Sequence, residues 1–248
     1  MEAITGKNEI IKQLRKKILS MEGFSTGSDN RRLDFGLKAM NAAFPGGAFP
    51  VGAIHEFSSP DETCAAAGNG FLSVLLATLM KNEGICLWVS LKRKLFPPAL
   101  KFFGIEPHRV IFIDVRHSKE VLWVMEQGLK NKALSAVVAE LRDVSFAESR
   151  RLQLAVENSK VTGFLHRQQP RMENTLACVA RWKITPLLSS TNDGLPGVGF
   201  PRWQVELVKI RNGRPGTWQF EWQNGNLRSV QKPVVLPSKS TQKQRKYA

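Results

Sequence analysis

The sequence of 248 residues has little cysteine and histidine, with three residues of the first kind and four of the second. Cys64, Cys86 and Cys178 lie far apart without CxxC spacing, and the histidines form no ligand pair such as HxxxH. These absences argue against a structural metal site and against a disulfide framework. Isolated cysteines behave as small apolar residues, so we expect three free, buried thiols.

Long apolar runs are also missing. No stretch reaches the roughly 18 uninterrupted apolar residues that a membrane helix needs. The N-terminal sequence MEAITGKNEIIKQLRKK has no apolar signal-peptide core. We therefore expect a cytoplasmic protein without a membrane partner.

Acidic residues are few compared with basic ones. The chain has 36 Lys and Arg against 21 Asp and Glu, which gives a formal net charge of +15. Such an excess attracts polyanions and supports phosphate binding that does not depend on sequence, so nucleic acid is the first partner to consider. A basic protein that is merely soluble, or that binds an acidic protein, remains an alternative.

Apolar runs that alternate with helical stretches predict an α/β fold. Strands are expected at 53–57, 85–90, 110–114, 133–141 and 161–167, and helices at 65–79, 98–103, 119–130 and 146–157. Strands separated by such helices form a parallel sheet covered by helices. The length fits one main domain with appendages.

The chain changes character beyond residue 180. Apolar and polar residues alternate with period two in 203–207 and in 218–222, and the turn-rich stretch 211–216 joins these runs. This pattern predicts an antiparallel ending, added to the edge of the sheet. The aromatic stripe Trp203, Trp218, Phe220 and Trp222 is expected in the core, with base stacking as the alternative.

Both ends of the chain are basic. We expect residues 1–29 to form an amphipathic helix and a linker. The helix is a candidate for binding a partner or a second copy of the chain through Ile10, Ile11, Leu14 and Ile18. Packing of this helix on its own core is an equal alternative. Residues 226–248 are expected to be a disordered tail after the domain of residues 30–225. The tail is a candidate arm for nucleic acid, or a solvated segment without function.

Several segments resemble the ImuA branch of the RecA-like family over about residues 30–225. These segments are GLKAM at 36–40, FPGGAFPVGAIHEF at 44–57, ALKFFGI at 99–105, SRRLQLA at 149–155 and LVKIRNGRPG at 207–216. The resemblance implies a RecA-like core and an accessory role in damage-induced translesion DNA synthesis. It also implies an ImuB-type polymerase-like partner, with single-stranded DNA as a further candidate.

The phosphate loop of that family is degenerate in this chain. A working loop, GxxxxGK[ST], needs glycines that let the backbone wrap the phosphates, a lysine for their charge and a hydroxyl for magnesium. Ser59, Cys64, Ala65 and Ala66 stand at those positions, with Pro60, Asp61, Glu62 and Thr63 between the first two. Asp61 and Glu62 would repel a triphosphate. We therefore expect neither a nucleotide cofactor nor catalysis, and we assign no catalytic residue.

Other candidate residues follow from strand ends and charge. Glu140 could be a remnant of a magnesium-holding acid, although a solvated glutamate at a strand end is the favoured interpretation. DNA-binding candidates are Arg167 and Arg171, expected in a loop after the 161–167 strand, and the tail residues Lys232, Lys239, Lys243, Arg245 and Lys246. Two alternatives stay open: a SulA-like inhibitor that binds a cytoskeletal GTPase, and an active DNA-dependent ATPase.

Overall fold

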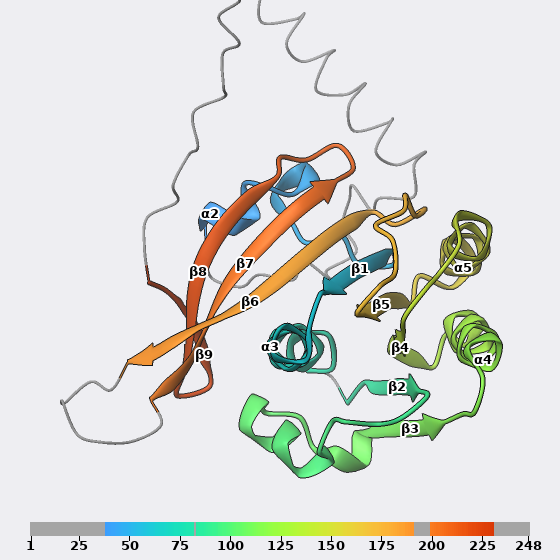
Figure 1. The fold of residues 1–248 in the computed structure, drawn as a ribbon, viewed down its shortest axis with the longest axis horizontal. Helices are drawn as coiled ribbons and strands as arrows, with labels where there is room; N and C mark the ends of the chain where they lie inside the picture. Colours follow the sequence, from blue (N-terminus) through green and yellow to red (C-terminus); the bar gives the residue numbers. More distant parts are fainter. Residues whose placement is uncertain (1–37, 82, 191–198, 231–248) are drawn as a thin grey trace, which may run out of the picture.

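The computed structural model describes residues 38–81, 83–190 and 199–230 (Figure 1). The strands are β1 (Ile54–Ser59), β2 (Ile85–Ser90), β3 (Val110–Asp114), β4 (Leu134–Leu141), β5 (Thr162–Gln168), β6 (Ala180–Ser190), β7 (Phe200–Ile210), β8 (Gly216–Gln223) and β9 (Asn226–Ser229). The helices are α2 (Lys38–Asn41), α3 (Glu62–Leu79), α4 (Ser118–Lys130), α5 (Phe146–Ser159) and the 3-10 helices η1 (Pro45–Gly47), η2 (Pro97–Phe103) and η3 (Pro107–Arg109).

The strands form one mixed sheet in the order β3-β2-β4-β5-β1-β6-β7-β8-β9. Neighbours from β3 to β6 are parallel, and β7, β8 and β9 each run antiparallel to the strand before them. Parallel neighbours need a crossover, and α3, α4 and α5 follow β1, β3 and β4 in that role (Figure 1). This arrangement confirms the predicted α/β class, with a mostly parallel sheet and an antiparallel C-terminal part.

The sheet separates two apolar cores, because successive side chains of a strand point to opposite faces. In β1, Phe57 belongs to the core under α3 and Ile54 to the core under α4 and α5. Figure 1 shows α3 on one side of the parallel strands and α4 with α5 on the other. The carboxyl ends of the parallel strands are thereby held in fixed positions.

Two of the predicted boundaries are wrong in ways that matter for the site. Helix α3 begins at Glu62 instead of Ala65, and β1 continues to Ser59, where a loop was expected. The expected disordered tail also begins too early, because residues 226–229 form β9 and Leu227 packs against the core. Strand β6 was not predicted at all, although Trp182 and Ile184 alternate with basic residues there.

The aromatic stripe of β7 and β8 is buried, which confirms its assignment to the core. Trp203, Trp218, Phe220 and Trp222 are each less than 8% exposed. The ring of Trp203 lies 6.3 Å from that of Phe71 in α3. These rings therefore join the antiparallel strands to the central helix and offer no stacking platform for bases.

The three cysteines are free, as predicted, with Cys64 and Cys86 buried and Cys178 partly buried. Within the described part of the chain, no group of three or more His, Cys, Asp or Glu side chains could hold a metal ion. In that part, α3 alone has the length and apolar composition to cross a membrane, and two thirds of it is buried inside the protein. This burial is typical of a core helix.

Candidate functional site

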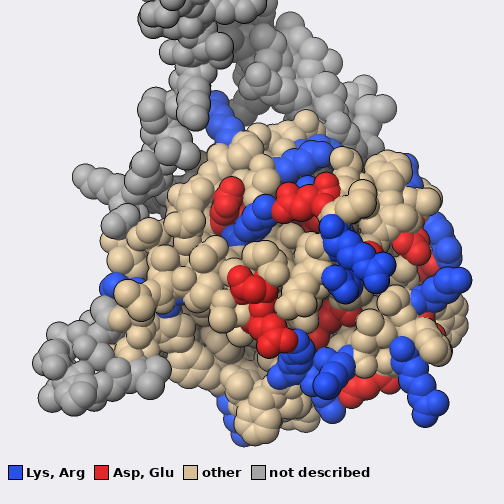
Figure 2. Space-filling model, in the orientation of Figure 1, with Lys and Arg blue, Asp and Glu red and all other residues tan. Residues whose placement is uncertain are grey.

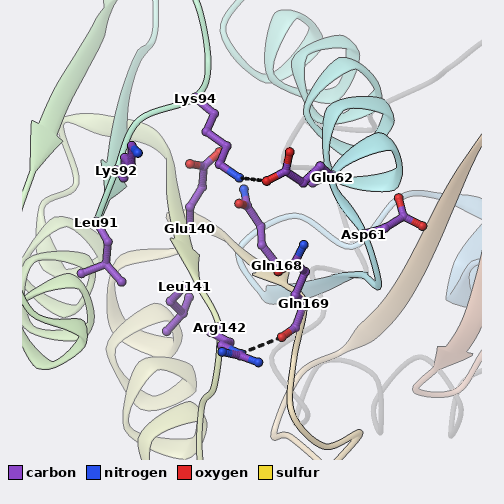
Figure 3. Close-up of a pocket in the computed structure, with 11 residues that line it drawn as sticks. Asp61, Glu62, Leu91, Lys92, Lys94, Glu140, Leu141, Arg142, Gln168 and Gln169 are labelled. Atoms are coloured by element: carbon purple, nitrogen blue, oxygen red, sulfur yellow. Dashed lines mark hydrogen bonds and ion pairs between the residues drawn. The ribbon is translucent and has the colours of Figure 1, made fainter.

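A pocket of about 180 Å³ opens where four parallel strands, β1, β2, β4 and β5, end (Figure 3). It is lined by Asp61, Glu62, Ala65, Leu91, Lys92, Lys94, Glu140, Leu141, Arg142, Gln168 and Gln169. Ligands of open α/β sheets bind outside the carboxyl ends of the strands. The pocket therefore occupies the place where a nucleotide would bind in a fold of this kind.

The connection between β1 and α3 is too short for a phosphate loop. Strand β1 ends at Ser59 and α3 begins at Glu62, so that only Pro60 and Asp61 connect them. The residues that correspond to the second glycine, the lysine and the hydroxyl residue, namely Cys64, Ala65 and Ala66, lie within the helix. No stretch of backbone is left between strand and helix to wrap a triphosphate.

The carboxylate of Asp61 occupies the N-terminus of α3. Its Oδ1 accepts hydrogen bonds from the backbone N–H of Cys64 at 2.7 Å and from the hydroxyl of Thr63 at 2.6 Å. These hydrogen bonds hold the pKa of Asp61 below its ordinary value. A helix N-terminus attracts anions through its free N–H groups, and here an internal carboxylate takes that position.

Glu62 and Lys94 form an ion pair at the mouth of the pocket, with 2.7 Å between Nζ and Oε1 (Figure 3). The hydrogen bond from Lys94 lowers the pKa of Glu62. One of the two lysines that line the pocket is therefore already paired with an acid of the same chain. On another wall, the guanidinium of Arg142 donates to the carbonyl of Gln169 at 2.9 Å.

Glu140, at the end of β4, is buried, whereas the sequence favoured a solvated side chain. Its exposed fraction is 4%, because α3 and the loop after β2 cover the strand end. Burial raises the pKa of Glu140 to about 7, while the hydrogen bond from Asn69, the nearby indole of Trp88 and the charge of Lys94 act in the opposite direction. The pocket thus contains one carboxyl group that can exchange a proton near neutral pH.

A buried chain of hydrogen bonds leads from this carboxyl group under α3. Asn69 Nδ2 donates to Glu140 Oε1 at 3.1 Å, and Asn69 Oδ1 lies 2.8 Å from His166 Nδ1. Because that oxygen can only accept, His166 carries its proton on Nδ1, and its Nε2 accepts from the Ser59 hydroxyl at 2.9 Å. Burial lowers the pKa of His166 to about 4, so the ring is neutral.

Gly68 of α3 leaves the space for this hydrogen-bond chain. A Cβ at this position would lie 3.1 Å from His166 Nε2 and 3.4 Å from Ser59 Oγ. The hydroxyl of Ser59 is sealed beneath the helix at 1% exposure, where a substrate in the pocket does not reach it. The arrangement resembles a serine–histidine pair in its contacts, but its position is that of a structural network.

Arg167 lies inside β5 and is 1% exposed, so its predicted place in a loop is wrong. Its guanidinium donates to Glu56 at 2.9 Å and to the carbonyl of Met172 at 2.8 Å. Glu56, itself 1% exposed, also accepts from Arg181 at 2.7 Å. A buried carboxylate needs such partners. Because the guanidinium of Arg167 is bound to Glu56, it is not available to DNA in this structure.

Of the remaining predicted site residues, one group lies within the described residues and the other lies outside them. Arg171 is exposed on the loop after β5, where its guanidinium lies 3.7 Å from Asp143. The partner-binding candidates Ile10, Ile11, Leu14 and Ile18 and the tail candidates Lys232, Lys239, Lys243, Arg245 and Lys246 lie outside the described residues. The predicted remnant role of Glu140 stays a prediction.

Sequence reasoning missed most of the pocket. Lys92, Lys94 and Arg142 follow β2 and β4 directly, so the carboxyl ends of the predicted strands could have identified them. Asn69 and His166 carry no local signal, because their roles come from the packing of α3 on β5. Figure 2 shows acidic and basic side chains next to each other on the face it presents.

Comparison of the sequence with known proteins identifies relatives of this chain. No protein-family model matches the chain. Among curated proteins, it is similar to the protein called ImuA from two strains of Caulobacter vibrioides. The identity is 34% over 203 residues, which cover 77% of this chain and 83% of each relative.

Proposed function

This chain belongs to the ImuA family, and on that premise we propose that it is a non-catalytic accessory protein of damage-induced (SOS) translesion DNA synthesis. Its partner in this role is an ImuB-type polymerase-like subunit, and its place of action is the cytoplasm. The α/β sheet with its parallel strands serves as a RecA-like core that no longer uses ATP. The proposal concerns binding and assembly.

The observation that carries the proposal is the closed phosphate position. The carboxylate of Asp61 takes the free N–H of Cys64, and two residues alone separate β1 from α3. Glu62 adds a second negative charge and occupies Lys94. A triphosphate would meet two carboxylates and no free lysine from the loop, and each like-charge contact at close range is unfavourable.

Partner binding is assigned to the N-terminal segment, and DNA contact to exposed cations. Ile10, Ile11, Leu14 and Ile18 remain the proposed contacts to the polymerase-like subunit or to a second copy. Arg171 and the tail lysines with Arg245 remain the proposed DNA contacts. Arg167 is removed from that set because its guanidinium is bound to Glu56.

Calorimetry with ATP and magnesium tests the absence of nucleotide chemistry. We expect no binding heat and no hydrolysis above a blank without protein. Tight ATP binding, or turnover that disappears in Glu140→Ala, would overturn the non-catalytic assignment and favour a DNA-dependent ATPase.

Co-expression with the polymerase-like subunit tests the partner. We expect a stable complex that is lost when residues 1–29 are removed. A complex with a filament-forming GTPase of cell division, and none with the polymerase-like subunit, would favour the SulA-like alternative.

A further inference from the structure

Five exposed cations of the described domain that have no acidic partner lie along one edge of the sheet. At the carboxyl edge, several cations already have acidic partners: Arg93 lies 3.3 Å from Asp114, Lys94 2.7 Å from Glu62 and Arg171 3.7 Å from Asp143. These pairs cancel part of the positive field at that edge, where Lys92, Arg116, Lys119 and Arg142 are exposed and are not part of these pairs. The opposite edge, where the parallel strands begin, has a different balance.

Five exposed cations lie along this second edge, and we call them the amino-edge row. Lys81 follows α3, Lys132 precedes β4, Lys160 precedes β5, Arg211 follows β7 and Arg214 precedes β8. Helices that connect parallel strands run back to the amino edge, so that the ends of α3, α4 and α5 bring the three lysines there. Within the described residues, none of the five has an acidic partner within 4.0 Å.

The two halves of the row are connected along the edge. A Cβ on Gly52 would lie 3.2 Å from the Cα of Lys160, which places Lys160 beside the segment that enters β1. Ile54 of β1 accepts from the backbone N–H of Val179, and Val179 accepts from that of Arg211, both at 2.8 Å. Lys81, Lys132 and Lys160 precede the neighbouring strands β2, β4 and β5, and Arg211 and Arg214 lie between β7 and β8, with β1 and β6 separating the two groups. Neighbouring strands lie about 4.8 Å apart, so the row follows the sheet edge in two groups.

Acidic side chains interrupt this edge at few places in the described domain. Glu106 is 3.7 Å from Lys101 and Glu157 is 3.8 Å from Arg150, so both have cations of their own. Glu83 is exposed between Lys81 and β2. The edge therefore keeps a net positive charge.

Helix stabilisation explains only part of the row. A cation in the last turn of a helix interacts favourably with its dipole, and Lys130 already provides one for α4. Arg211 and Arg214 lie in the hairpin between β7 and β8, where there is no helix. The edge also has little apolar surface for a protein partner, with Ile85 and Ile111 as its exposed large apolar side chains in the described domain.

We propose that the amino-edge row binds the sugar–phosphate backbone of nucleic acid without reading its sequence. A line of unpaired cations with few apolar neighbours fits a polyanionic chain, whose binding is driven by counterion release. This surface is separate from Arg171 and from the C-terminal tail. The inference rests on the DNA-binding part of the proposed function and is independent of the polymerase-like partner.

The test compares two full-length variants that lose the same charge. The first carries Lys81→Gln, Lys132→Gln, Lys160→Gln, Arg211→Gln and Arg214→Gln. The matched control replaces five exposed cations away from the amino edge: Lys92→Gln, Arg116→Gln, Lys119→Gln, Arg142→Gln and Arg228→Gln. Affinity for a fluorescent thymidine oligonucleotide is measured by anisotropy at several salt concentrations, and thermal melting checks that both variants fold.

We expect the amino-edge variant to lose at least about tenfold in affinity at low salt and the control to lose much less. Each phosphate contact contributes about 0.7 to the slope of log affinity against log salt for a single strand, so the loss of five contacts should lower the magnitude of this slope by about 3.5. Equal losses in both variants would show that net charge alone matters and would overturn the inference, as would tighter binding of polyglutamate than of the oligonucleotide. An amino-edge variant with unchanged affinity for the oligonucleotide would overturn the inference while leaving DNA binding by the protein intact. A wild-type chain that binds no oligonucleotide would overturn the inference and would also remove DNA from the proposed function.

Discussion

Replacing Glu140 with glutamine should stabilise the protein at alkaline pH and hardly at all at acidic pH. Burial raises the pKa of Glu140 from 4.5 to about 7, so the folded protein holds a proton that the unfolded chain releases. As pH rises through this window, stability falls by about 1.4 kcal/mol per pH unit. The cost of ionising the carboxyl group in its buried position therefore reaches about 3 kcal/mol above about pH 8. Glutamine keeps an oxygen that can accept from Asn69 and removes the ionisation.

The assay is urea unfolding of Glu140→Gln and the wild type at about pH 5 and about pH 8, with free energies obtained by linear extrapolation. We expect a gain of less than about 1 kcal/mol at the lower pH and about 3 kcal/mol at the higher pH. Glu106→Gln is the matched control, because the Glu106 carboxylate is largely exposed and its pair with Lys101 is long. This control should change stability by less than about 0.5 kcal/mol at both pH values.

Two results would refute the reasoning. A gain that is the same at both pH values would show that Glu140 does not titrate in this window. A loss of stability at about pH 8 would show that the ionised carboxylate is well compensated by Asn69, Trp88 and Lys94. The expected result would instead show that Glu140 destabilises the fold at the carboxyl edge. Residues that cost stability in this way are common at functional sites.

Three further predictions concern stability. Glu56→Gln should lower the free energy of unfolding by about 3–5 kcal/mol, because it leaves the buried guanidinium of Arg167 and the partly buried one of Arg181 without a carboxylate; Glu62→Gln, which breaks an exposed pair, should leave the free energy of unfolding nearly unchanged in the same urea titration. Asp61→Ala should lower the stability of the protein through loss of the α3 cap, with Asp61→Asn retaining most of the stability, and equal stability of all three proteins in thermal melts would contradict the capping role. Below about pH 6.5 the unfolded chain binds protons at His55 and His166, whereas the folded protein keeps both buried rings neutral because their pKa values lie near 4. The free energy of unfolding should therefore fall by about 2.7 kcal/mol for each pH unit of acidification. Protonation of Glu140 in the folded protein should offset about half of this loss down to its ordinary pKa. A flat stability profile between about pH 4.5 and 6.5 would show that these histidines do not resist protonation.

The sequence predicted the parts of the fold that depend on local patterns. The apolar runs at 85–90 and 110–114 match β2 and β3 residue for residue. Strand β2 is continuous in apolar residues because it is buried on both faces, whereas β3 is an edge strand that is only partly buried. Alternation in β7 and β8 correctly indicated an antiparallel region with an aromatic core. Strand β6 was missed although it alternates, because its segment contains Pro186 and no turn signal announces it.

From the sequence, the candidate site could be predicted only as residues that differ from those of a working phosphate loop. Ala65 stands where the lysine of a phosphate loop would be, and this can be seen in the sequence alone. That Asp61 caps α3, and that two residues replace the loop, depends on where β1 ends and α3 begins. Helix boundaries are decided by capping and packing together, which local patterns describe poorly.

What the sequence by itself determined was the class of the fold, the excess of positive charge and the missing lysine of the phosphate loop. The tertiary structure alone decided that Glu140 is buried with a pKa near 7 and that Arg167 pairs with Glu56. It also decided that Lys81, Lys132, Lys160, Arg211 and Arg214, which are far apart in the sequence, lie along the amino edge. The reason is physical: periodicity and residue type act over a few neighbouring positions, whereas desolvation, ion pairing and the place of a charge depend on contacts between residues far apart in the chain.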